Sequence, residues 1–211
     1  PEPPVAERLR ERESQPEINR TRISTIRERI ARRMRESLSS TAQYTLHRLA
    51  DATGLLRLRA RIKATNGASG ANISDMLAFC TIQALLQVPD LNVQFIDNCL
   101  VCHKEVHLGF ACDTPRGLLV PVVRGADKLT LADLASRIRA LTKKAMEGSI
   151  GVDDLTGATF TITNLGSLGI ESFTPVLDPP QVAILGIGMI QPRPVRNGEK
   201  VEFVDALSLS L

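Results

Sequence analysis

The residues best placed to do chemistry lie in one stretch, Thr159–Gly188. An alternating β-rich run ends at Thr163, and Asn164 then opens a Gly-rich turn. A buried-strand run that ends at Gly186 closes the stretch, so two strands would flank a loop carrying hydroxyl and amide groups. The Thr163 hydroxyl and the loop N–H groups could face a ligand at the strand end. The alternative is a plain buried strand–loop–strand core, which the periodicity alone favours.

A second group of chemically useful residues is cationic. Arg57, Arg59, Arg61 and Lys63 decorate one predicted helix. Fixed cations suit a phosphate-bearing ligand. The alternative is an ordinary solvated helix face, which the sequence alone favours.

The cysteines and histidines provide weak metal signals. Cys99 and Cys102 have metal-ligand spacing, but no second pair accompanies them, so we expect core or hairpin packing. His103 and His107 are four residues apart in a segment that looks extended, and they do not form an HExxH motif. We therefore expect no metal site.

Composition limits the class of protein. With 211 residues and 43% hydrophobic content, the chain suits a globular α/β domain with a buried core. Lys and Arg exceed Asp and Glu by only 26 − 23 = 3, and the aromatic residues are six Phe and one Tyr, so we expect no nucleic-acid partner. No apolar run is long enough to span a membrane, and the N-terminus lacks a signal core. Four unpaired cysteines fit a cytoplasmic location.

Several elements must position these residues. Residues 1–20 are polar and Pro-bearing, which indicates a linker or N-terminal arm ahead of a domain at 21–211. We expect helices from Thr25 to about Ser40, from Asp51 or Thr53 to Lys63, over 72–88 and from Thr130 to Gly148. Thr65–Gly70 is an expected loop, and Asn197-Gly198 an expected hairpin turn. The expected strands cover 43–50, 91–95, 99–106, 107–112, 118–123, 159–163, 182–186 and 201–211.

Six runs, in order, resemble the catalytic domain of the dihydrolipoamide acyltransferases of 2-oxo-acid dehydrogenase complexes. They are Arg29–Met34, Asp51 with Leu55–Arg59, Pro89–Asn92, His107–Val122, Phe160–Gly166 and Pro179–Gly186. Each run is weak alone, but the ordered set from Thr21 to Leu211 is specific.

The resemblance implies a mixed-sheet α/β sandwich similar to chloramphenicol acetyltransferase, with helices packed on the sheet. It also implies homotrimers that assemble into larger cages, with decarboxylase and dihydrolipoamide dehydrogenase components as partners. The implied reaction moves an acyl group between coenzyme A and a dihydrolipoyl group, which a separate lipoyl domain carries, at a site between two subunits. Acetyl, branched-chain and succinyl groups all stay open. A free antibiotic acetyltransferase shares the fold, but the Pro-bearing arm and the loop context of Thr163 argue against it.

The resemblance also implies roles for single residues. Thr163 matches the hydroxyl that donates to the tetrahedral oxyanion. Arg59 matches a coenzyme A contact, Lys63 lies one turn further along the same helix, and Asp113 matches an aspartate near the coenzyme.

One departure from the family concerns the general base, a histidine in an HxxxDG motif. None of His47, His103 and His107 is followed by xxxDG, and the resemblance would put the motif just beyond Leu211. We therefore expect the 211 residues by themselves to be nearly inactive, and to form trimers but not cages. The alternative function is a non-catalytic structural core that organises partner enzymes.

Overall fold

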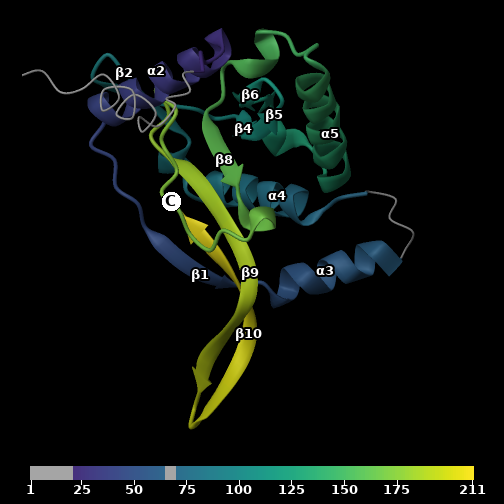
Figure 1. Ribbon diagram of the computed structural model, residues 1–211. Coiled ribbons are helices and arrows are strands. Elements are labelled where there is room, and N and C mark those ends of the chain that lie inside the picture. The colour runs from purple at the N-terminus through teal and green to yellow at the C-terminus, as the bar shows by residue number, and fades with distance from the viewer. Residues whose placement is uncertain (1–20, 65–69) are drawn as a thin grey trace, which may run out of the picture.

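A six-stranded mixed sheet lies at the centre of the computed structural model, which describes residues 21–64 and 70–211 (Figure 1). The strand order is β1-β10-β9-β8-β4-β7. β8 pairs in parallel with both β4 and β9, while the other neighbours pair antiparallel. The strands are β1 (His47–Asp51), β4 (Leu108–Phe110), β7 (Val122–Val123), β8 (Phe160–Asn164), β9 (Ile184–Asn197) and β10 (Lys200–Ser210).

Two small hairpins accompany this sheet. The first joins β2 (Val93–Ile96) to β3 (Cys99–Cys102) through Asp97 and Asn98, whose φ angles are 49° and 60°. Asn and Asp tolerate this left-handed conformation in tight hairpin turns. The second hairpin joins β5 (Cys112–Thr114) to β6 (Gly117–Leu119). Pro121 then interrupts the chain between β6 and β7, and β7 is an edge strand of the central sheet.

Four helices occupy the predicted places. They are α2 (Thr25–Ser40), α3 (Thr53–Ala64), α4 (Ile73–Gln87) and α5 (Leu131–Glu147); short 3-10 turns cover Pro89–Leu91, Ala126–Lys128, Asp153–Leu155 and Gly166–Leu168. Asn72 and Asp75 form a capping box at the start of α4. Thr130 caps α5, which ends at Gly148 in the left-handed conformation (φ 74°).

Alternation along the strands gives the central sheet two different faces. Leu108, Phe160 and Ile162 pack into the main core with apolar side chains of α4 and α5. Thr161 of β8 therefore points to the opposite face, where α2 lies, and a Cβ atom on its β4 neighbour Gly109 would point to the same face. The protein is thus a mixed-sheet α/β fold with helices packed on the sheet, as predicted.

Several predicted strand boundaries were wrong. The strand expected at 99–106 ends at Cys102, the one expected at 118–123 is split into β6 and β7 in different sheets, and the one expected at 182–186 continues to Asn197 as β9. β1 begins at His47 rather than Gln43. In the β9–β10 hairpin, Asn197 pairs with Lys200, so Gly198 and Glu199 form the turn instead of Asn197 and Gly198. The predicted arm at 1–20 and most of the Thr65–Gly70 loop lie outside the described residues.

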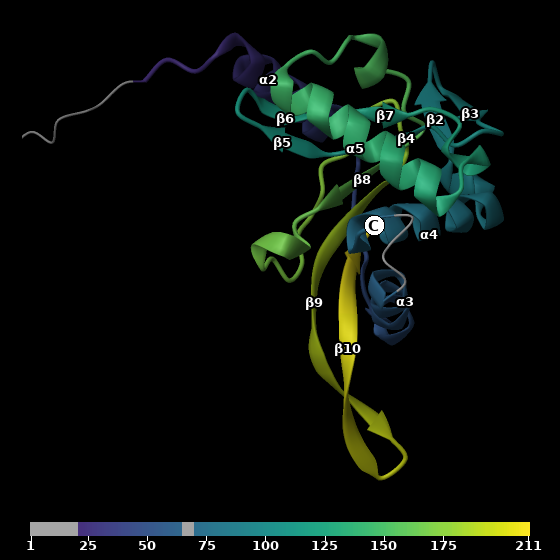
Figure 2. The ribbon, with the colours of Figure 1, turned by 90° about the vertical axis from the view of Figure 1, so that its right-hand side faces the viewer.

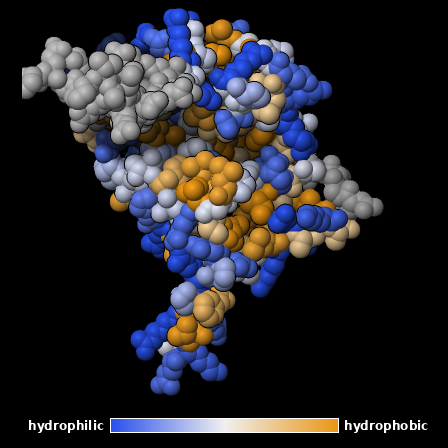
Figure 3. Space-filling view, viewed as in Figure 1, coloured by the Kyte–Doolittle hydropathy of each residue, from blue (hydrophilic) through white to orange (hydrophobic). Residues whose placement is uncertain are grey.

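The β9–β10 hairpin projects from the body as a long arm (Figures 1 and 2). Its side chains include Val195, Val201 and Phe203, and Phe203 is 72% exposed. Figure 3 shows apolar surface on this arm as well as on the body. None of the helices within 21–64 and 70–211 is both long and apolar enough to cross a membrane.

Glycines fix the loop that follows β8 against β9. A Cβ atom on Gly188 would lie 2.0 Å from the Glu171 carbonyl oxygen, and one on Gly166 would lie 2.3 Å from the Gly188 carbonyl oxygen. Two backbone hydrogen bonds, Leu165 N–H to Ile187 O and Met189 N–H to Ile170 O, hold the same contact. The loop can approach this closely because neither glycine has a side chain.

Gly188→Ala should therefore lower the free energy of unfolding by roughly 1–3 kcal/mol, as overpacking against backbone does. Gly54→Ala is the matched control, because nothing lies within 4 Å of its Cβ position on α3. That control should leave stability unchanged or raise it by about 0.5–1 kcal/mol. Urea denaturation measures both changes, and equal stability of Gly188→Ala and the unsubstituted protein would contradict the close contact.

Candidate active site

Thr163 lies near the C-terminal end of β8, half-buried in the wall of a cavity of about 380 Å³. The cavity lies on the α2 face of the sheet. Its other walls come from α2, from β6 with the following Val120, from Ala111 between β4 and β5, and from the segment 173–178. The lining is mainly apolar: Ile30, Met34, Ala111, Leu118, Leu119, Val120, Leu155, Phe173, Pro175, Val176 and Ile184.

The hydroxyl of Thr163 is available to a ligand. It makes no hydrogen bond with any residue in the described parts of the chain. Thr161, two residues earlier on the same face, is 2% exposed and donates its hydroxyl to Gln181 Oε1 at 2.8 Å. The plain core interpretation therefore suits Thr161, whereas Thr163 keeps a free donor at the cavity wall. The catalytic role of Thr163 stays a prediction.

Asn164 anchors the end of β8 from the other face. Its amide nitrogen donates to Ser74 Oγ of α4 at 3.0 Å, and its Oδ1 accepts from Gly166 N–H at 2.9 Å. Ser74 belongs to the first turn of α4, next to the buried Asp75 of the capping box. Burial raises the pKa of Asp75, while the hydrogen bond from Asn72 N–H acts in the opposite direction. The strand end that carries Thr163 is thus tied to a helix start.

Gly186 makes room for the aromatic side of the cavity. It pairs with Thr163 across β8 and β9. A Cβ atom at Gly186 would lie 3.0 Å from the Phe173 ring and 3.3 Å from Pro175. Phe173 and Pro175 can therefore pack over β9 directly beside Thr163.

Sequence reasoning missed a charged pair in the cavity wall. Arg33 Nε of α2 donates to Asp178 Oδ1 at 2.5 Å across 145 sequence positions. Two further contacts hold the same segment: Ser37 Oγ donates to Leu177 O at 2.7 Å, and Leu177 N–H donates to Gln43 Oε1 at 3.2 Å. Only the folded chain brings these residues together.

Arg59 and Lys63 lie on the exposed face of α3. The opposite stripe of α3, which includes Leu58 and Ile62, packs against Met76 of α4 and Ala135 of α5. Figures 1 and 2 show α3 beneath α4, on the side of α4 away from α2. Within one chain, these cations are not brought to the Thr163 cavity.

Asp113 lies exposed on β5 and pairs with Leu118 of the cavity lining, but Asp113 itself is not among the lining residues. The β5–β6 hairpin approaches α2 at Gly117, whose Cβ position lies 3.1 Å from Ile30. Burial raises the pKa of the neighbouring Cys112 thiol, and the charge of Asp113 raises it further. Cys112 is therefore held as a thiol, which makes it a poor nucleophile.

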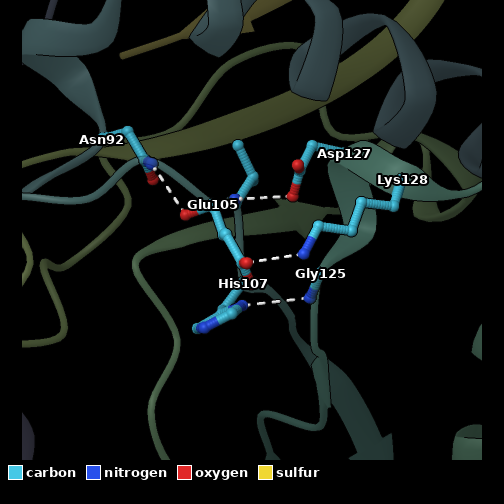
Figure 4. Close-up of polar contacts among 7 residues, drawn as sticks. Asn92, Glu105, His107, Gly125, Asp127 and Lys128 are labelled. Carbon is cyan, nitrogen blue, oxygen red and sulfur yellow. Dashed lines mark hydrogen bonds and ion pairs between the residues drawn. The ribbon is translucent and has the colours of Figure 1, made fainter.

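The two histidines of the extended segment brace the fold. The N–H of Gly125 donates to His107 Nδ1 at 3.0 Å, and His103 Nε2 lies 3.1 Å from Gln94 Oε1. Figure 4 shows the His107 contact beside an ion pair between Glu105 and Lys128. Within the part of the chain that the structure describes, no group of three or more His, Cys, Asp or Glu side chains could hold a metal ion.

The model of the family 2-oxoacid dehydrogenases acyltransferase (catalytic domain) matches residues 15–211. A relative from Bacillus subtilis (strain 168), the dihydrolipoyllysine-residue acetyltransferase component of an acetoin cleaving system, is 41% identical over 90% of this chain and 48% of its own length. The acetyltransferase component of the Mycobacterium bovis pyruvate dehydrogenase complex is 42% identical over 82% of this chain and 32% of its own length. The chain thus spans half or less of the length of these relatives.

Solved structures of dihydrolipoamide acyltransferases also match this chain. The dihydrolipoamide acetyltransferase of Azotobacter vinelandii, studied for the role of a serine, a histidine and an asparagine in catalysis, matches with a TM-score of 0.89 and 33% identity, over 100% of this chain and 86% of that chain. A chloramphenicol acetyltransferase matches with a TM-score of 0.53 over 90% of this chain and 89% of that chain, and at 14% identity it shares the fold alone.

Proposed function

Because the chain belongs to the family of 2-oxoacid dehydrogenase acyltransferase catalytic domains, we propose that it transfers an acyl group between a dihydrolipoyl thiol and coenzyme A. The observation that carries this proposal is the free hydroxyl of Thr163 in the wall of a mainly apolar cavity. The names of the relatives, both dihydrolipoyllysine-residue acetyltransferase components, support it.

The chemistry needs a proton acceptor and an oxyanion donor. The sulfur of coenzyme A attacks the carbonyl carbon of the acyl-dihydrolipoyl thioester, and its thiol proton leaves to a base. The carbonyl oxygen becomes a tetrahedral oxyanion, to which Thr163 Oγ1–H donates a hydrogen bond. The carbon–sulfur bond to the dihydrolipoyl group then breaks, and the departing sulfur takes up the proton. The apolar cavity wall beside Thr163 suits the acyl group and the alkyl chain of the dihydrolipoyl group that carries it.

The placement of the candidate residues supports a site made by two subunits. Thr163 lines the cavity on the α2 face of the sheet, while Arg59 and Lys63 lie on α3, on the side of α4 away from α2. We propose that Arg59 and Lys63 of a neighbouring subunit hold the coenzyme A phosphates, with Arg59 the more important, and that Asp113 lies near the coenzyme. A homotrimer closes such a head-to-tail contact. The match to the cubic core of a pyruvate dehydrogenase multienzyme complex supports assembly.

The reaction also needs a general base that takes the proton of the attacking thiol. None of the three histidines stands in an HxxxDG motif. We propose that these 211 residues supply the oxyanion donor and the phosphate contacts but not the base.

A second candidate function is a structural core that only organises a decarboxylase and a dihydrolipoamide dehydrogenase. The match to a multienzyme core favours an organising role, and the free Thr163 hydroxyl favours catalysis. A measurement of acyl-transfer turnover by the protein at its natural length distinguishes the catalytic function from the structural one.

Thr163→Ala should lower kcat of the native protein by roughly 10²–10³-fold with little change in KM, because the hydrogen bond forms mainly in the transition state. Thr163→Ser should keep most of the activity. Release of coenzyme A from acetyl-coenzyme A with dihydrolipoamide as acceptor gives both constants. A kcat of Thr163→Ala within twofold of the unsubstituted protein would sink the assignment.

Arg59→Ala should weaken coenzyme A binding by about 1.5–3 kcal/mol, as expected for a charge-assisted hydrogen bond. Calorimetry measures the affinity, and dephospho-coenzyme A identifies the phosphate that is held. Arg57→Ala, a neighbouring exposed cation on α3, is the matched control and should have little effect. Equal affinities for Arg59→Ala and the unsubstituted protein would return Arg59 to an ordinary solvated face.

A subunit-mixing test extends this experiment to the composite site. Trimers that mix Thr163→Ala and Arg59→Ala chains regain one intact site each if the two residues act across a subunit boundary. They regain none if both residues act within one chain.

The 211-residue chain alone should run as a trimer, not a cage, in analytical ultracentrifugation. It should be nearly inactive in acyl transfer, because neutral thiols with a pKa near 8.5 need a base to attack efficiently at neutral pH. Turnover near that of a relative would show that the base lies within these residues, and a cage-sized particle would contradict the assembly claim.

A further inference from the structure

The charged groups in the wall of the Thr163 cavity are already paired with each other. Among the described residues that line it, only Arg33 and Asp178 are charged. Arg33 Nε donates to Asp178 Oδ1 at 2.5 Å, and the Asp178 side chain is only 17% exposed. The wall therefore carries no net charge, and its cation is bound to a carboxylate of the protein itself.

We propose that this cavity selects an uncharged acyl group, acetyl or short branched-chain, and rejects a dicarboxylic group such as succinyl. The inference rests on the proposed function, and it names the substrate class of the same site. A succinyl group would bring a second carboxylate into a mainly apolar space. That carboxylate would have to lose its water without gaining an unpaired cation, and burying a charge without a partner is costly.

Asp178 also opposes a dicarboxylic substrate directly. Its carboxylate accepts from Arg33 Nε and offsets the charge of that cation, and like charges repel at short range. The segment that carries Asp178 is held to α2 independently, by the contacts of Leu177 with Ser37 and Gln43. The negative charge can therefore be removed by substitution while the wall keeps its backbone contacts.

The test measures kcat/KM of the native protein with acetyl-, isobutyryl- and succinyl-coenzyme A and free dihydrolipoamide. We expect the succinyl value to be about 100-fold below the acetyl value, in the range that an unpaired buried charge produces. Asp178→Asn leaves the wall with a net positive charge, so the ratio of the succinyl to the acetyl value should rise at least about tenfold. The double variant R33M/D178N removes both charges and should abolish that rise. Thermal unfolding of each variant controls for folding, and the ratio of two substrates on one sample cancels losses of active protein.

The outcomes are distinguishable. Succinyl transfer within about tenfold of acetyl transfer by the unsubstituted protein, or an unchanged ratio in Asp178→Asn, overturns the inference and leaves the proposed function standing. Absence of transfer with all three acyl groups overturns the proposed function, and the inference falls with it.

Discussion

The candidate site depends on one constraint, which is that side chains along the central strand β8 point alternately to the two faces of the sheet. Parallel neighbours flank it on both sides, so its backbone is fixed along the ladder. Because side chains alternate, Ile162 and Asn164 point into the helical face while Thr163 points into the cavity. The core on one face thus fixes the direction of a hydroxyl on the other. A slip of one residue would bury Thr163 among α4 and α5 and expose Ile162, and the loss of apolar burial opposes that slip.

The glycines near β8 and β9 allow this strand to be surrounded so closely. Gly166 and Gly188 let the loop after Thr163 touch β9 through backbone alone, and Gly186 admits the Phe173 ring beside the hydroxyl. Gly109 on β4 likewise leaves room for a side chain of β8, because a Cβ atom at Gly109 would lie 2.7 Å from Thr161 Oγ1. These positions need no unusual backbone angle. They need the absence of a side chain, which is why the region has many glycines without being a flexible linker.

Local signals in the sequence were enough to predict the helices. Apolar periodicity and capping residues such as Asn72 and Thr130 depend on neighbours within a few positions, and the structure has the four helices where they were expected. Strand ends were less well determined, because β1 is limited by its pairing with β10 at a separation of more than 150 residues. The resemblance of motifs pointed to Thr163, but the pair of Arg33 and Asp178 left no local trace. Contacts between distant segments are set by tertiary packing, which no short pattern encodes.

A rigid strand is a favourable place for an oxyanion donor and a poor place for the remaining machinery. A donor acts by being aligned before charge develops, so a hydroxyl on a strand held on both edges loses little free energy in reorganising. Long cations that must reach flexible phosphates are better presented from an exposed helix, and Arg59 and Lys63 lie on such a surface. One small sheet cannot direct both kinds of group to the same point, because the helices that bury one face separate it from the other. The homotrimer that we propose would resolve this conflict, since the helix of one subunit could approach the cavity of the next while each chain keeps a continuous core.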